Sequence, residues 1–69
     1  MTDVIMIEIM AQKIEELEDS IEKESLILLK KDVQERSLSP AILQGLIANI
    51  RNSPQGRWIA SLLLNYYEL

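Results

Sequence analysis

The stretch Ser37-Leu38-Ser39-Pro40 divides this chain of 69 residues into two long helical patterns. Ser39 is a residue type that caps helix N-termini, because its hydroxyl accepts a hydrogen bond from a free backbone N–H. Pro40 suits the first position of a helix, where its missing N–H costs nothing. We therefore predict a turn at residues 37–40 and a helix that begins at about residue 40.

Before this turn, no glycine or proline interrupts residues 3 to 37. Apolar residues recur there at helical spacing, first as the stripe Ile7, Met10, Ile14, Leu17, Ile21 and Leu28. Leu26, Leu29 and Val33 carry the stripe onward with a shifted phase. We predict one helix over residues 3 to 37. A break near Asp19–Ser20 is the weaker alternative, because neither residue requires one.

After the turn, apolar residues again recur at helical spacing, and a second helix is predicted over residues 40 to 68. Gly45 lies inside it and suggests a close approach between helices. Pro54 within a continuous helix would clash with the carbonyl of Ile50. The second helix is therefore expected to kink or break at residues 52–56, and either outcome fits the pattern. The predicted fold is a single all-α domain, an antiparallel helical hairpin.

The residue inventory argues against catalysis and against cofactor or metal binding. The sequence has neither histidine nor cysteine, so the usual general base and the commonest metal ligands are missing. Glu15, Glu18, Asp19 and Glu22 would share one helix face, but a solvated acidic face is the simpler interpretation. The net charge of −4 argues against nucleic-acid binding. No apolar run approaches the ~20 residues that a membrane span needs, and no secretion signal is expected.

A two-helix hairpin cannot bury all the apolar side chains of this sequence. Residues 58–69 and 4–10 are apolar on more than one side, and such helices are normally buried on all sides. We therefore predict a protein-binding role, with the partner-binding residues Ile7, Met10, Ile14, Trp58, Leu62 and Tyr66. One alternative is a self-contained homodimeric bundle with a regulatory or phage-encoded role. Another is a small nucleotide-binding helical protein that uses Arg57 and Trp58.

The chain resembles the YscE-type small subunit of type III secretion needle chaperones. The resemblance rests on Leu28-Leu29-Lys30-Lys31-Asp32-Val33 at the end of the first helical pattern, the turn Ser37 to Pro40, and the apolar stretch from Trp58 to Tyr67. It implies an antiparallel helical hairpin that acts as a non-catalytic co-chaperone in the bacterial cytoplasm. Such a subunit binds a larger tetratricopeptide-like chaperone, and the pair keeps the needle protein soluble. Without its partner, the chain would be expected to form homo-oligomers.

Overall fold

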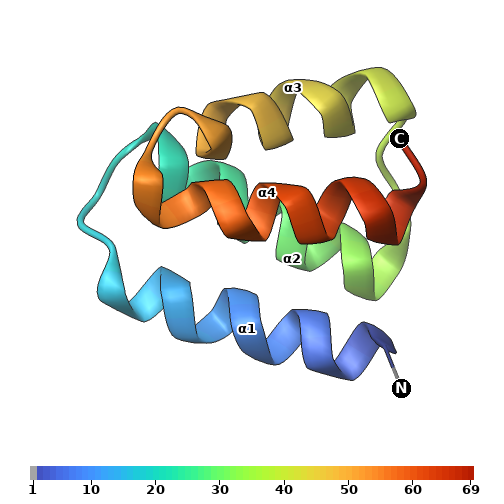
Figure 1. Cartoon of the computed structure of the whole chain (residues 1–69). Helices are drawn as coiled ribbons and strands as arrows, with labels where there is room; N and C mark the ends of the chain where they lie inside the picture. The colour runs from blue at the N-terminus through green and yellow to red at the C-terminus, as the bar shows by residue number, and fades with distance from the viewer. Residues whose placement is uncertain (1) are drawn as a thin grey trace.

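The chain folds as four helices joined by short loops. The computed structural model describes residues 2 to 69, with the exception of the Thr2 side chain. The helices are α1 (Thr2–Glu16), α2 (Ile21–Glu35), α3 (Pro40–Arg51) and α4 (Pro54–Tyr67). Consecutive helices run in opposite directions and pack against each other (Figure 1). Residues 2 to 69 contain no strand, so the all-helical prediction is confirmed.

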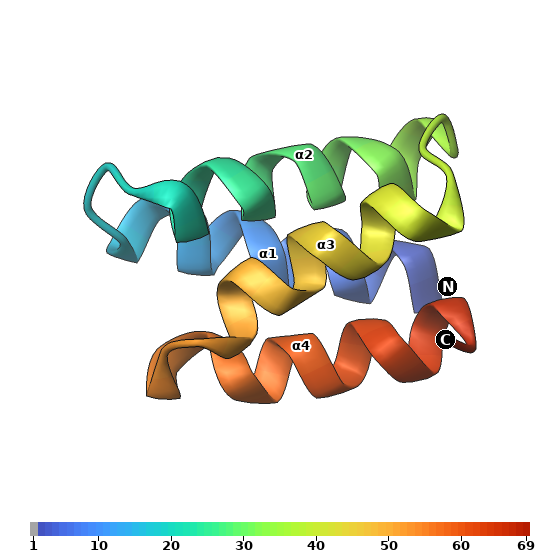
Figure 2. The ribbon, with the colours of Figure 1, turned by 90° about the horizontal axis from the view of Figure 1, so that it is seen from above.

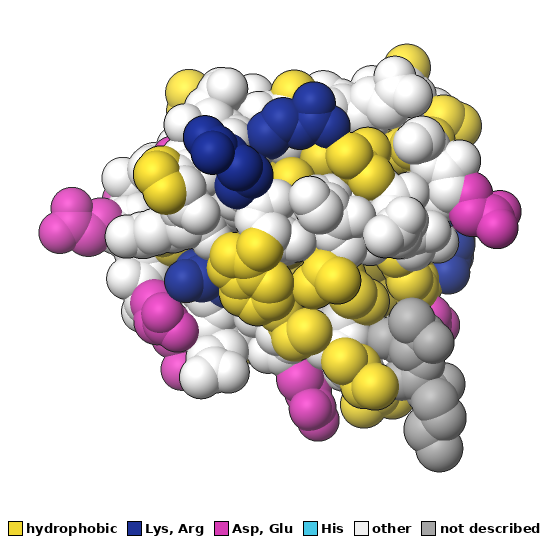
Figure 3. Space-filling model, viewed as in Figure 1, with side chains coloured by type: hydrophobic (Ala, Val, Ile, Leu, Met, Phe, Trp, Pro, Cys, Tyr) yellow, Lys and Arg dark blue, Asp and Glu magenta, His cyan; other side chains and the backbone are white. Residues whose placement is uncertain are grey.

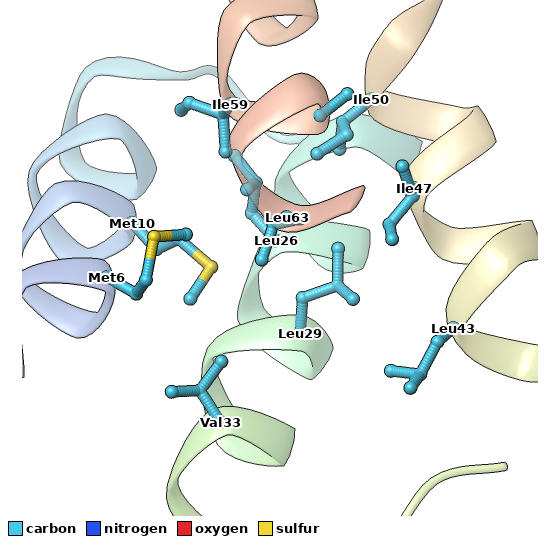
Figure 4. Packing of buried hydrophobic residues seen from close by; sticks show 11 residues of the cluster. Met6, Met10, Leu26, Leu29, Val33, Leu43, Ile47, Ile50, Ile59 and Leu63 are labelled. Atoms are coloured by element: carbon cyan, nitrogen blue, oxygen red, sulfur yellow. The ribbon is translucent and has the colours of Figure 1, made fainter. Parts of the chain in front are cut away.

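The helices surround one apolar core. Helices α2 and α4 form a middle layer, with α3 on one side of it and α1 on the other (Figures 1 and 2). Side chains from all four helices point into the space between them (Figure 4). The buried apolar residues are Met6, Met10, Leu26, Leu29, Val33, Leu43, Ile47, Ile50, Ile59, Ala60 and Leu63.

The single helix predicted over residues 3 to 37 is wrong, because the chain leaves the helical conformation between Glu16 and Ile21. Ser20 is extended there and caps α2, with its hydroxyl accepting a hydrogen bond from the backbone N–H of Lys23 at 3.2 Å. An unbroken helix of this length would measure ~50 Å, and the two halves of its apolar stripe could not pack against each other. The break lets α1 and α2 lie antiparallel, so Met10 and Leu26 bury in the same core. The two-arm hairpin is thereby replaced by four helices.

The loop between α2 and α3 is organised by a buried carboxylate. Asp32 is 1% exposed, and its Oδ1 accepts hydrogen bonds from the backbone N–H groups of Ser37 at 2.8 Å and Leu38 at 2.7 Å. Arg36 ends α2 in the left-handed conformation, with φ of 54°. Ser39 then caps α3, which begins at Pro40. Helix α3 therefore begins at the residue that the Ser39-Pro40 pair predicts.

Between α3 and α4 the structure has a break, which settles the choice between a kink and a break at residues 52–56. Ser53 caps α4, with its hydroxyl accepting from the N–H of Gly56 at 3.1 Å. A Cβ atom on Gly56 would overlap the carbonyl oxygen of Ile50, so only glycine fits this close approach. Gly45, by contrast, has no atom within 4 Å of its missing Cβ position. The close approach expected at Gly45 is therefore found at Gly56.

Candidate protein-binding surface

The six residues predicted to bind a partner do not form one surface. Met10 is fully buried in the core, where no partner can reach it in the folded chain. Ile7, Ile14 and Tyr66 are half-buried against that core. Trp58 and Leu62 are exposed, 48% and 37% respectively. The set therefore divides into core residues, residues at the edge of the core and surface residues.

One residue of the exposed pair on α4, Trp58, lies beside Ile9 of α1. Trp58 and Leu62 are four residues apart, and so are Ile5 and Ile9, so each pair lies along one side of its helix. Ile9 and Trp58 line the same groove, together with Gln12 and Glu16. Ile5 is 57% exposed and lies one turn before Ile9. We call these four residues (Ile5, Ile9, Trp58 and Leu62) the α1–α4 seam.

The space-filling view shows hydrophobic side chains gathered where α4 and α1 meet (Figure 3). The six predicted residues include Trp58 and Leu62 of the seam but not Ile5 and Ile9, which the sequence analysis places only in the apolar stretch 4–10. The signal for them was present, since Ile5 and Ile9 lie off the main apolar stripe at a spacing of four. Their significance depends on α4 lying beside α1, which the predicted hairpin did not contain.

Charged groups mark the two ends of the seam. At the Trp58 end, the Lys13 ammonium lies 3.4 Å from the Glu16 carboxylate. At the other end, Tyr66 donates a hydrogen bond to Asp3 and accepts one from the Arg36 guanidinium at 2.6 Å. Arg36 also lies 3.8 Å from the Asp3 carboxylate. The seam is therefore an apolar strip with both signs of charge at each end.

The cluster around Arg36 holds three separate parts of the chain together. The Tyr67 hydroxyl donates to Oδ2 of buried Asp32 at 2.6 Å, and the Arg36 guanidinium lies over the ring of Tyr66. Burial raises the pKa of the Tyr67 phenol above its ordinary value, and the hydrogen bond to Asp32 raises it further. Burial and Asp3 likewise raise the pKa of Tyr66. Both phenols therefore remain hydrogen-bond donors at neutral pH and fix the end of α4 against α1 and α2.

The acidic residues predicted to share a helix face do not do so. Helix α1 ends at Glu16, so Glu18 and Asp19 lie in the loop before α2. Asp19 pairs with Lys23 at 3.4 Å, and its side chain is fully exposed. No group of three or more acidic residues in the described part of the chain is arranged to hold a metal ion.

Within residues 2 to 69, no helix has the length and apolar character needed to cross a membrane. The sequence matches no family model, and the comparisons with curated proteins and with solved structures also found no match.

Proposed function

We propose that this chain is a non-catalytic protein-binding subunit and that the α1–α4 seam is the surface it uses. The observation that carries the proposal is the groove that Ile9 and Trp58 share, together with the exposure of Trp58 and of Ile5 and Leu62, each one helical turn from a residue of the groove. Ile5, Trp58 and Leu62 belong neither to the buried core nor to the side chains packed against it, so their exposure has no explanation in the packing of this chain. Contiguous exposed apolar side chains of this kind usually mark an interaction surface.

The arrangement favours an amphipathic helix as the occupant. Two antiparallel helices present two parallel rows of apolar side chains, and a third helix fits between such rows with residues at spacings of three and four. The single tryptophan of the chain lies in this groove, and tryptophan is enriched among the residues that dominate binding energy. The mixed charges at both ends favour a partner segment with an apolar middle and polar ends.

For the partner itself, we propose the tetratricopeptide-like chaperone that the resemblance implies, bound in the bacterial cytoplasm together with the needle protein. Tetratricopeptide repeats stack helix pairs into superhelices and so offer helical surfaces to the seam. The four-helix fold differs from the hairpin implied by the resemblance. Support for this partner therefore rests on the seam and on the quoted residues, not on the overall shape.

The test is co-expression of the chain with a candidate tetratricopeptide-like chaperone and needle protein, followed by size-exclusion chromatography with mass determination. We expect a defined complex that Trp58→Asp and Leu62→Asp each abolish. The matched control is Ile42→Asp on α3, where the side chain is 52% exposed and outside the seam. Circular dichroism must show that all three variants remain helical.

Tryptophan fluorescence gives an independent readout, because Trp58 is half-exposed and is the only tryptophan. Its emission should shift to shorter wavelength when the complex forms. A complex that survives both seam substitutions would refute the use of the seam. A chain that binds neither the chaperone nor the needle protein would refute the co-chaperone role. Quenching of the Trp58 fluorescence by added nucleotides would instead support the nucleotide-binding alternative.

A further inference from the structure

A second apolar surface lies on α2, on the side opposite to the core. Leu26, Leu29 and Val33 point into the core, whereas Ile27 and Leu28 are 45% and 46% exposed. These two residues lie at the middle of α2 and line a shallow hollow with Glu24. Helix α2 lies at the opposite edge of the fold from α4 (Figure 2), so this face is separate from the α1–α4 seam.

The charges around this apolar pair have a symmetric arrangement. Glu24 comes three residues before Ile27, and Lys31 comes three residues after Leu28. Both charged residues lie within one helical turn of the pair and on the same outward side of α2. Within residues 2 to 69, neither of them forms an ion pair. Along the middle of the face, between Ile21 and Glu35, the order is therefore acid, apolar pair, base.

We propose that this face binds the same face of a second copy of the chain, with the two α2 helices antiparallel. A two-fold axis that passes between Ile27 and Leu28 places each Ile27 opposite Leu28 of the second copy and brings the charged residues at the two ends of the pair together. Each Glu24 then faces Lys31 of the second copy, and the two apolar pairs meet at the centre. Such self-complementarity is what a two-fold interface between identical chains requires.

The order of charges on this face favours a second copy of the chain as the partner and an antiparallel orientation of the two α2 helices. Parallel α2 helices in register would place acid against acid and base against base, which is unfavourable. A helix of 15 residues is only ~22 Å long, so the contact is small. Small interfaces of this kind are typical of weak association. The expected species is a dimer in concentration-dependent equilibrium with its monomer, and it does not depend on the proposed function of the seam.

The experiment is sedimentation equilibrium of the whole chain, of 7.9 kDa, over a wide concentration range. The wild-type chain should approach twice its monomer mass as the concentration rises. Glu24→Lys and Lys31→Glu should each weaken dimerisation about tenfold, because each replaces two exposed ion pairs with two repulsive contacts. The combined variant E24K/K31E restores the opposite-charge pairing and should recover most of the wild-type affinity.

Mixing the two single variants gives a sharper result. The E24K variant carries lysine at both positions 24 and 31, and the K31E variant carries glutamate at both. The mixture should therefore form heterodimers with two opposite-charge pairs, whereas each variant alone should remain largely monomeric. Leu28→Asp should abolish dimerisation, whereas Ile42→Asp on α3 should leave it unchanged. Circular dichroism checks that every variant is folded.

A wild-type chain that stays monomeric at every concentration would overturn the proposal. So would a dimer that is insensitive to both charge substitutions, or one that the combined variant fails to recover. Dimerisation lost with Trp58→Asp but kept with Leu28→Asp would place the contact on the seam and also overturn it. The sedimentation and co-expression experiments test different surfaces. Failure of the α2 dimer therefore does not decide whether the seam binds a partner, and the reverse also holds.

Discussion

The two glycines of this chain should respond in opposite directions to the same substitution by alanine. Gly45 lies in the middle of α3, is exposed, and has nothing within 4 Å of the position a Cβ would take. Alanine is favoured over glycine inside a helix by about 1 kcal/mol, and here no clash opposes that gain. Gly45→Ala should therefore stabilise the fold by about 1 kcal/mol, which raises Tm by roughly 4–8 °C for a domain of this size.

Gly56 has the opposite environment. A Cβ there would overlap the Ile50 carbonyl oxygen and lie 3.1 Å from the Ile50 carbonyl carbon and 3.3 Å from its Cβ. The obstacle is mainly backbone at the end of α3, which cannot rotate away as a flexible side chain would. Overpacking typically costs 1–3 kcal/mol, and the helix-propensity gain offsets about 1 kcal/mol at most. We expect Gly56→Ala to destabilise the fold by about 2 kcal/mol.

The assay is urea and thermal unfolding of both variants and the wild type, followed by far-ultraviolet circular dichroism at one protein concentration. The two variants serve as controls for each other, since the chemical change is identical. A Gly56→Ala variant at least as stable as the wild type would refute the close approach of α4 to the end of α3. A destabilised Gly45→Ala variant would refute the open surroundings of Gly45.

Three further predictions test other parts of the fold. Leu29→Ala removes a fully buried side chain from α2 and should cost about 2–5 kcal/mol in urea unfolding, whereas Ile42→Ala at the surface should change stability by less than ~0.5 kcal/mol. Ser20→Ala removes the α2 cap and should cost about 1 kcal/mol, and an unchanged unfolding midpoint would argue against the break between α1 and α2. The pKa of Tyr67 is raised in the folded chain, so its contribution to stability is complete below its ordinary pKa of 10.0 and falls as the pH rises above it. Urea unfolding at a series of alkaline pH values should therefore show a shallower loss of stability for Tyr67→Phe than for the wild type.

The helix starts that the sequence predicts well are those where two local signals coincide. Ser39-Pro40 combines a capping hydroxyl with a residue that cannot continue a preceding helix, and α3 begins at this proline. Ser53-Pro54 combines the same two signals; the sequence leaves a kink and a break open there, and the structure has a new helix, α4, that begins at Pro54. Ser20 has the capping hydroxyl but no proline after it, so local sequence alone could not require a break there. The shift in apolar phase between Leu17 and Leu26 was the remaining signal. It is explained by α1 and α2 being separate helices that face each other.

Side chains whose role depends on distant partners were beyond sequence reasoning. Asp32 looks like an ordinary charged residue near a helix end, yet it is buried because Ser37, Leu38 and Tyr67 satisfy its carboxylate. Met10 is predicted to bind a partner because a two-helix hairpin cannot bury every apolar side chain, whereas the fold of four helices buries Met10 in its own core. Ile5 and Ile9 become part of a surface only because α4 lies beside α1.

The two proposed surfaces are compatible because they lie on different sides of the molecule. Helix α2 forms one edge of the fold and α4 the opposite edge (Figure 2). A dimer formed through Ile27 and Leu28 would therefore leave the seam of each copy open and directed away from the two-fold axis. Such a dimer would present two partner sites. When both partner segments belong to one assembly, the first binding event raises the effective concentration of the second segment at its site and so increases the overall affinity. On this argument, Leu28→Asp should leave the affinity for an isolated partner segment unchanged and weaken binding only to a partner that carries two such segments.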